Sequence, residues 1–216
     1  MKVSITSHSG LIQQSSGNGV AIEGKEYHEA PFDNRWDDLI AVIDEGTGPA
    51  QLTYEAFRDT GFFMRFFRHN QDDNIFMTYQ LPHQWNSATA VNIHAHIVPM
   101  ASGSGNAKFD FAYSWINVGS EFPAASGWIS GSVTASFTPA NQYKQSIVSF
   151  GNFTPVDQRE SSILILKVER PGSSDILDTY ATNKDHGTGA ANIGILSFDM
   201  HYQKSKAGTV SPYPEV

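Results

Sequence analysis

The chain has 216 residues and contains no cysteine, so neither a disulfide framework nor a thiolate zinc site is available, and its length is common for one all-β domain. Its 14 Lys and Arg residues against 22 Asp and Glu residues give a net charge of −8, which argues against nucleic acid as a partner because that partner requires clustered basic side chains. No segment approaches the roughly 18 apolar residues of a membrane span, so we expect no membrane partner and folding in the cytoplasm.

The two ends of the chain have compositions that favour extended structure. Residues 1–31 are rich in Ser, Gly and Gln and too polar to form a packed element alone. We expect an extended N-terminal arm there, either disordered or ordered on a neighbouring subunit. Residues 207–216 contain Pro212 and Pro214, which favour extended backbone. The sequence therefore predicts one folded domain, residues 32–206, between an arm and a tail.

Between the ends, apolar and polar residues alternate with the period of two that β-strands require, and helical periodicity is almost absent. From Lys108 to Trp115, aromatic residues occupy one face and polar or small residues the other, which is typical of a half-buried antiparallel strand. The same alternation runs from residue 196 to residue 203. The further predicted strands are Leu39–Ile43, Phe62–Phe67, Asn74–Leu81, Val91–Val98, Trp128–Phe137, Ser146–Phe153 and Ser161–Glu169.

These strands, joined by turn-forming residues, indicate an all-β fold, an antiparallel two-sheet sandwich. We favour a jelly roll, which needs about eight strands, and keep a Greek-key sandwich of the immunoglobulin type as the alternative. A helical piece is expected only around Gln51 to Thr60, where Tyr54 and Phe57 stand three residues apart.

Two histidines, His94 and His96, lie on the predicted strand 91–98. Alternation places the apolar residues of this strand toward the core and both histidines on the opposite face. Side chains at positions i and i+2 stand about 7 Å apart, within reach of one metal ion. Because polar groups of this kind are more often satisfied by hydrogen bonds, we expect no cofactor. If a metal is bound, its candidate ligands are His94, His96 and, near the C-terminus, His201.

The His-x-His strand also resembles cupins, jelly-roll enzymes that bind Fe, Mn, Zn or Ni through two histidines, a glutamate shortly after them and a third histidine on a later strand. The match fails at the glutamate, since the first Glu after His96 is Glu121. Cupin ligands also point into the barrel, whereas the apolar face of this strand should occupy that interior. A divergent cupin remains an alternative, in which Asp199 and His201 supply later ligands if their strand neighbours His94.

The segment Leu81-Pro82-His83-Gln84-Trp85 should end a strand, because proline cannot donate a hydrogen bond to a ladder. We expect its indole to pack on the sheet edge. The alternative is an exposed Trp85 or Trp128 that stacks on a sugar, which would make the protein a carbohydrate-binding adsorption module. The residues expected at subunit interfaces are His83, Trp85, His94, His96, Asp199 and His201.

Catalytic patterns are missing from the sequence. The nucleophile-elbow pattern Gly-x-Ser-x-Gly is absent, so a hydrolase triad has no sequence anchor. The sequence offers no means of pairing two carboxylates across a glycosidase cleft. We therefore assign no catalytic residue and expect no enzyme.

Three motifs together resemble a group of tailed-bacteriophage virion proteins: Gln-Leu-Pro-His-x-Trp at 80–85, the His-x-His strand with Pro99, and Asp-x-His-Tyr-Gln at 199–203. The likeness extends from about Trp36 to Lys204. The chain departs from the pattern at residues 88–90, where Ala-Thr-Ala stands in place of a Gly-Thr-Asp-like turn. The resemblance implies a component of the virion, with no activity attached by the motifs.

Within that class we expect a capsid decoration or cement protein that stabilises the head lattice as a trimer. Its partners would be the major capsid protein or neighbouring virion proteins, and it would be assembled into the virion in the host cytoplasm. Low charge with many Ser, Asn and Thr agrees with wet, polar subunit contacts. The alternative within the class is a neck, tail or fibre-associated protein.

Overall fold

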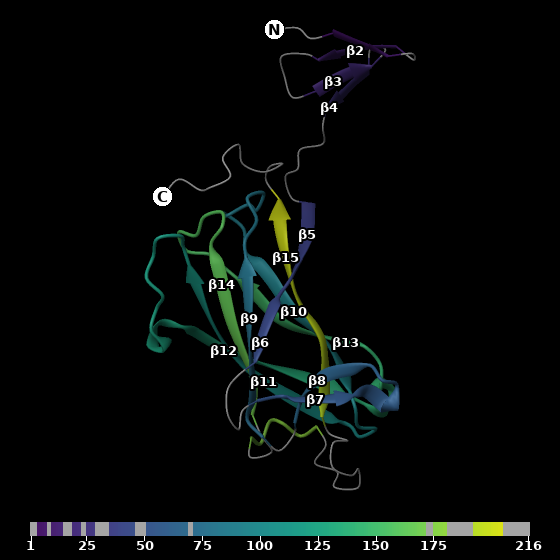
Figure 1. The fold of residues 1–216 in the computed structure, drawn as a ribbon, viewed down its shortest axis with the longest axis vertical. Helices are drawn as coiled ribbons and strands as arrows, with labels where there is room; N and C mark the ends of the chain where they lie inside the picture. Colours follow the sequence, from purple (N-terminus) through teal and green to yellow (C-terminus); the bar gives the residue numbers. More distant parts are fainter. Residues whose placement is uncertain are drawn as a thin grey trace.

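The structure, a computed structural model, describes residues 35–45, 51–68, 71–171, 175–180 and 192–204, and the backbone of short strands within residues 4–28 (Figure 1). The sequence predicted an extended arm over residues 1–31, but the structure pairs these N-terminal strands with one another, in chain order and antiparallel. They are β1 (Ser4–Ser7), β2 (Gly10–Gln14), β3 (Gly19–Ile22) and β4 (Lys25–His28). Such pairing satisfies backbone groups that an isolated arm would leave to water. The predicted tail, residues 207–216, lies outside the described residues.

The other strands form one six-stranded and one five-stranded antiparallel sheet. The six-stranded sheet has the order β13 (Ser146–Phe153), β10 (Val91–Pro99), β15 (Ile193–Lys204), β8 (Phe63–Phe67) and β7 (Thr53–Ala56), with β5 (Arg35–Ile40) on the other half of β15. The five-stranded sheet has the order β12 (Ile129–Phe137), β11 (Gly105–Ile116), β14 (Ile163–Arg170), β9 (Asp73–Gln80) and β6 (Val42–Glu45).

The strands from β8 to β15 have the arrangement of a jelly roll. In one sheet β8, β15, β10 and β13 are neighbours, and in the other β9, β14, β11 and β12 are neighbours. The chain therefore changes sheets at each connection among these strands except the β11–β12 hairpin. This is the two-sheet, double Greek-key topology of a jelly roll. The predicted all-β jelly roll is confirmed, and the immunoglobulin-type alternative is wrong.

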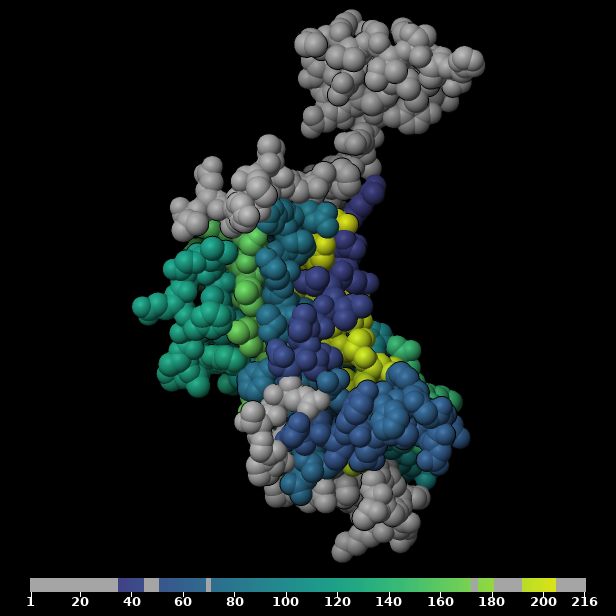
Figure 2. All heavy atoms as spheres, in the orientation of Figure 1, coloured from purple at the N-terminus to yellow at the C-terminus, as the bar shows by residue number. Residues whose placement is uncertain are grey.

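The predicted strand Leu39–Ile43 divides between the two sheets. Residues 35–40 pair with β15, whereas residues 42–45 pair with β9. At the change of partner, the Ala41 N–H donates a hydrogen bond to the Phe198 carbonyl oxygen at 3.0 Å. Figure 2 shows this segment, in purple, lying along the yellow surface of β15. One continuous run of chain thus connects the two sheets.

The core lies between the sheets and follows the alternation of the strands. On β9, Ile75, Met77 and Tyr79 are buried, while their neighbours Phe76 and Thr78 are partly exposed. The same pattern holds on β14. Full burial of a large apolar side chain stabilises the fold by about 1.5–3 kcal/mol relative to exposure. The side chains that remain outside this core determine what each sheet presents to solvent.

The helical piece predicted around Gln51 to Thr60 is wrong. Residues 53–56 form strand β7, which pairs with β8, and only Phe57–Asp59 makes a 3₁₀ turn. Thr53 and the tyrosine after it favour strands, and pairing with β8 outweighs an i,i+3 spacing in so short a segment. Among the described residues, no helix is long and apolar enough to cross a membrane.

Candidate functional site

The histidine pair lies on β10, next to β15 in the six-stranded sheet. Antiparallel pairing aligns His94 with Asp199 and Asn92 with His201. Side chains directly opposite one another on neighbouring strands stand about 5 Å apart at Cβ. Ordinary strand pairing therefore gathers three imidazoles and a carboxylate from distant parts of the sequence.

Alternation turns this patch away from the core. Ile93 and Ala95 of β10 and Phe198 and Met200 of β15 are at most 1% exposed between the sheets, so the residues between them face outward. There they contribute to an open groove of about 400 Å³. The groove is lined by Asp38, Asn92, His94, His96, Ile147, Ser149, Asp199 and His201.

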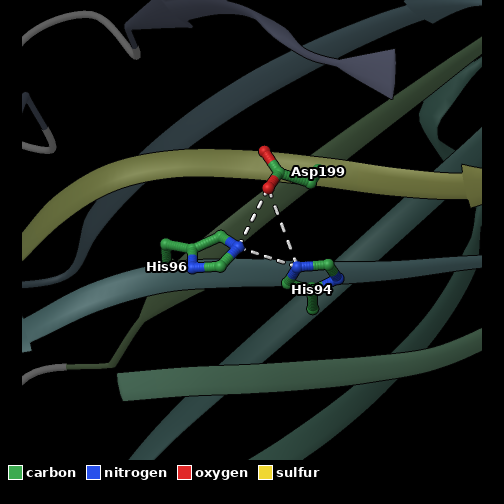
Figure 3. A group of neighbouring side chains, drawn as sticks. All are labelled: His94, His96 and Asp199. Carbon is green, nitrogen blue, oxygen red and sulfur yellow. Dashed lines mark hydrogen bonds and ion pairs between the residues drawn. The ribbon is translucent and has the colours of Figure 1, made fainter. Parts of the chain in front are cut away.

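Three of these side chains converge on one point. Figure 3 shows His94, His96 and Asp199 pointing toward one another from the two strands. The two histidine Nε2 atoms are 2.9 Å apart. Asp199 Oδ2 lies 2.9 Å from His96 Nε2 and 3.7 Å from His94 Nε2. We call these three residues the triad.

His201 completes the imidazole patch but has a different partner. Its ring centroid lies 4.7 Å from that of His94, while its Nδ1 lies 3.2 Å from Oδ1 of Asp38 on β5. Burial, followed by the neighbouring His201 and His96 rings, lowers the pKa of His94, and Asp199 acts in the opposite direction. The neutral imidazole of His94, with a lone pair on one ring nitrogen, is therefore favoured.

Two β-bulges flank the histidines. The pairing register shifts between Ile93 and His94 on the β13 side, and between His96 and Ile97 on the β15 side. Bulges bend and twist a strand, and they redirect side chains beside functional sites. His94 and His96 occupy the stretch of β10 between the two shifts.

The structure rearranges the predicted metal candidates. His94 and His96 do meet, and the third group beside them is Asp199, which the sequence offered as an interface residue and, in the cupin alternative, as a later ligand; His201 does not join them. Gln145 was missed, although its Nε2 lies 2.5 Å from His96 Nδ1. No sequence spacing could have found it, because only the β10–β13 pairing brings it near. The outward direction of the triad agrees with the predicted alternation and differs from the inward ligands of cupins.

His83 and Trp85, the other interface candidates, lie apart from the triad. His83 Nε2 is 2.8 Å from Ser161 Oγ, which joins the turn after β9 to the turn before β14. Trp85 is 1% exposed, and its ring stacks on Trp115 with centroids 5.8 Å apart. The hypothesis of an exposed, sugar-stacking Trp85 is wrong, because the turn folds the indole into the core.

A second groove lies on the outer face of the five-stranded sheet. It has a volume of about 420 Å³. The small outward residues Ala112 and Ser130 face each other on β11 and β12, as do Asp110 and Ser132. Beneath them, a Cβ at Gly131 would overlap the ring of Phe111, so a larger residue there would displace that ring. We call this groove the trough, and its lining residues are Asp110, Phe111, Ala112, Ser130, Gly131, Ser132, Lys167 and Glu169.

Charged and aromatic side chains border the trough. Lys167 Nζ lies 2.6 Å from Glu169 Oε2, and both side chains are about one-third exposed. Phe76 is the strand partner of Lys167. Its ring meets that of Trp128 edge to face, with centroids 6.4 Å apart. Trp128, which the sequence offered as a sugar platform, is therefore half-buried on this outer face.

No protein-family model matches the sequence, and no curated protein matches it. Solved structures of similar fold include the C-terminal family 22 carbohydrate-binding module of Clostridium thermocellum, at 8% identity and TM-score 0.37, with 81% of this chain and 92% of that one covered. The xylan-binding domain from Paenibacillus barcinonensis has 13% identity and TM-score 0.33 over 82% and 93%. A carbohydrate-binding module that recognises mannan has 10% identity and TM-score 0.35 over 78% and 99%.

The comparisons contradict the predicted function. The solved structures named above are carbohydrate-binding modules, and none of the three is a capsid decoration or cement protein as expected from the sequence. The resemblance of the three motifs to phage virion proteins, the trimer and the virion location stay predictions.

Proposed function

We propose that the protein is a non-catalytic carbohydrate-binding module whose glycan lies in the trough on the five-stranded sheet. The observation that carries this proposal is the composition of one outer face: a floor of small side chains bordered by hydroxyl, carboxylate and ammonium groups, with the Phe76–Trp128 pair nearby. A sugar presents hydroxyls to polar groups and its C–H faces to aromatic rings. Ligand sites generally combine apolar surface with a few polar groups that fix orientation.

The charges at the trough favour a neutral glycan. Lys167 is paired with Glu169, and Lys108 lies 3.2 Å from Asp110 and 2.6 Å from Asp175. An anionic sugar would approach Asp110 and Glu169 while the nearby ammonium groups are already engaged, and like charges repel. Carboxylates accept hydrogen bonds from sugar hydroxyls, and serine hydroxyls either donate or accept them.

The position of the carboxylates favours binding over hydrolysis. Asp110 and Glu169 are direct strand partners on β11 and β14, so they lie side by side on one wall. Glycosidases need their two carboxyl groups on opposite sides of the scissile bond. The trough includes residues of β12, the edge strand of its sheet. An extended glycan chain therefore has room to pass over that edge.

Two matched lysine substitutions test the site. Ser132→Lys places a long side chain in the trough, and Ser149→Lys places the same side chain in the groove of the six-stranded sheet; both serines are exposed. Binding to soluble xylan and mannan, and to an array of neutral oligosaccharides, is measured by affinity electrophoresis and calorimetry. We expect Ser132→Lys to abolish binding and Ser149→Lys to retain it. Loss of binding in Ser149→Lys alone would move the site to the other sheet, and no glycan binding by the wild type would refute the function.

A further inference from the structure

The triad is separate from the proposed glycan site, since it lies on the other sheet and shares no residue with the trough. Its three facing atoms are nitrogen, nitrogen and oxygen, at separations of 2.9, 2.9 and 3.7 Å. A point about 1.9 Å from all three atoms exists in their plane. Zinc bonds imidazole nitrogen at about 2.0–2.1 Å and carboxylate oxygen at about 2.0–2.2 Å, so an ion fits slightly above that plane.

Hydrogen bonding alone leaves this arrangement incompletely satisfied. An ionised carboxylate only accepts hydrogen bonds, and each neutral imidazole carries one N–H. If Gln145 Nε2 donates to His96 Nδ1, a single Nε2–H of His96 must serve both Asp199 and His94. The other oxygen of Asp199, Oδ1, is buried and has no hydrogen-bond partner among the described residues. A buried polar atom without a partner costs free energy, and a cation at the convergence point would neutralise this carboxylate.

From this convergence we propose that His94 Nε2, His96 Nε2 and the Asp199 carboxylate bind one divalent transition-metal ion. Two imidazoles and one carboxylate form a donor set that suits Zn²⁺, Fe²⁺, Co²⁺ or Ni²⁺, whereas Mg²⁺ and Ca²⁺ prefer oxygen ligands alone. Because three protein ligands do not fill a tetrahedral or octahedral shell, at least one position remains for an oxygen donor from the groove.

The surrounding residues have the roles expected around a metal ligand. Ligating histidines usually hydrogen-bond through their second nitrogen to a polar group that fixes the ring, and Gln145 contacts that nitrogen of His96. When Nε2 binds the ion, Nδ1 carries the proton, and a half-turn of the Gln145 amide lets Oε1 accept it. Both ligand strands have neighbours on either side at this point, since β10 lies between β13 and β15 and β15 pairs with β5 at Asp199. Such strands hold ligands more rigidly than loops do.

Substitution of His201 tests whether two or three histidines bind the ion. Its ring stands beside that of His94, but its Nδ1 is paired with Asp38. The geometry therefore assigns it to the groove wall. His201→Ala should leave the metal affinity within about tenfold of the wild type. Loss of a residue that only supports a ligand typically lowers the affinity by about 10–100-fold, and loss of a triad ligand should lower it further.

The experiment uses the full chain, freed of metal by chelation and dialysis, and titrated with ZnCl₂ by calorimetry and with CoCl₂ by visible absorption. We expect one zinc per chain and a visible cobalt band, both lost in His94→Ala, His96→Ala and Asp199→Asn. His83→Ala, a histidine outside the groove, is the matched control and should bind as the wild type does. Circular dichroism of the metal-free variants verifies that each one folds.

Two results would overturn the site. One is a wild type that takes up no zinc and shows no cobalt band, which would leave a hydrogen-bonded histidine cluster. The other is a folded Asp199→Asn variant that binds as tightly as the wild type, which would place the ion elsewhere. Neither result affects the proposed glycan site, because the Ser132→Lys substitution tests a groove on the other sheet that shares no residue with the triad.

Discussion

The indole of Trp85 lies flat against that of Trp115, with ring planes 9° apart. Trp85 comes from the turn after β9, and Trp115 lies near the end of β11. The stack therefore fastens an irregular turn to the five-stranded sheet. An isolated bridge between Trp85 and Lys204 connects the same turn to β15, so this tryptophan links both sheets of the jelly roll.

Trp85→Ala should lower the free energy of unfolding by about 3–5 kcal/mol, the usual cost of removing a buried large aromatic side chain. Urea denaturation followed by tryptophan fluorescence measures the change. Trp128→Ala is the control, because its half-buried ring lies on an outer face; we expect it to cost less stability and to weaken glycan binding. Equal stability of Trp85→Ala and the wild type would contradict the assignment of this motif to the core.

The buried pair Arg170–Asp178 should be essential for stability. Arg170 Nε and Nη2 donate to the two oxygens of Asp178 at 2.8 and 3.0 Å, and both side chains are at most 3% exposed. Asp178→Ala would leave a buried guanidinium without its carboxylate, and breaking such a pair costs about 3–5 kcal/mol. Glu169→Ala removes the partly exposed partner of Lys167 and should cost at most about 1 kcal/mol. Chemical denaturation measures the free energy of unfolding of both variants. Similar losses in the two would contradict the claim that the buried pair contributes more to stability than the exposed one.

The ion pair Asp37–Lys204 should stabilise the fold to a degree that depends on pH. The hydrogen bond from Lys204 Nζ lowers the pKa of the Asp37 carboxyl below its ordinary value of 3.8 and raises the pKa of Lys204 above 10.5. A lowered carboxyl pKa contributes stability above the unfolded value, and this contribution is lost as pH falls through the folded pKa. A raised lysine pKa contributes stability that is lost as pH rises through its folded value.

Asp37→Asn should therefore be slightly less stable than the wild type at neutral pH, and the difference should be small because water screens an exposed pair. The difference should vanish in strong acid. Urea midpoints at neutral and strongly acidic pH measure it, with Asp44→Asn as a comparison at another exposed acid. A constant difference across that range would show that the ion pair is not its source.

Zinc should raise the melting temperature of the wild type, and the rise should grow with the logarithm of the free zinc concentration above the Kd of the triad. Binding to the folded state alone stabilises it by about 2.7 kcal/mol when free ligand is 100 times Kd. The same concentration should leave the melting temperature of Asp199→Asn unchanged, and EDTA should reverse the effect. Magnesium is the control ion, because the triad has too few oxygen ligands for it. An equal rise with magnesium would indicate a nonspecific charge effect.

Local alternation located most strands correctly. The segments 108–115 and 196–203 lie within β11 and β15, and Ser146–Phe153 matches β13 over its full length. In each of these segments, apolar side chains lie mainly on one face because that face of a strand in a sandwich packs against the core. The helix predicted for the segment 51–60 was wrong, because the strand found there is stabilised by pairing with β8. The local pattern of apolar residues does not reveal which segments pair.

Alternation along single strands is enough to predict a sandwich of antiparallel strands and an outward face shared by His94 and His96. It cannot predict that Asp199 lies beside these histidines, that Gln145 contacts His96, or that Trp85 is buried. Each of these depends on which strands pair and in what register. A shift of one residue would turn every side chain of a strand to the other face, so the register, set by burial over the whole strand, fixes the site.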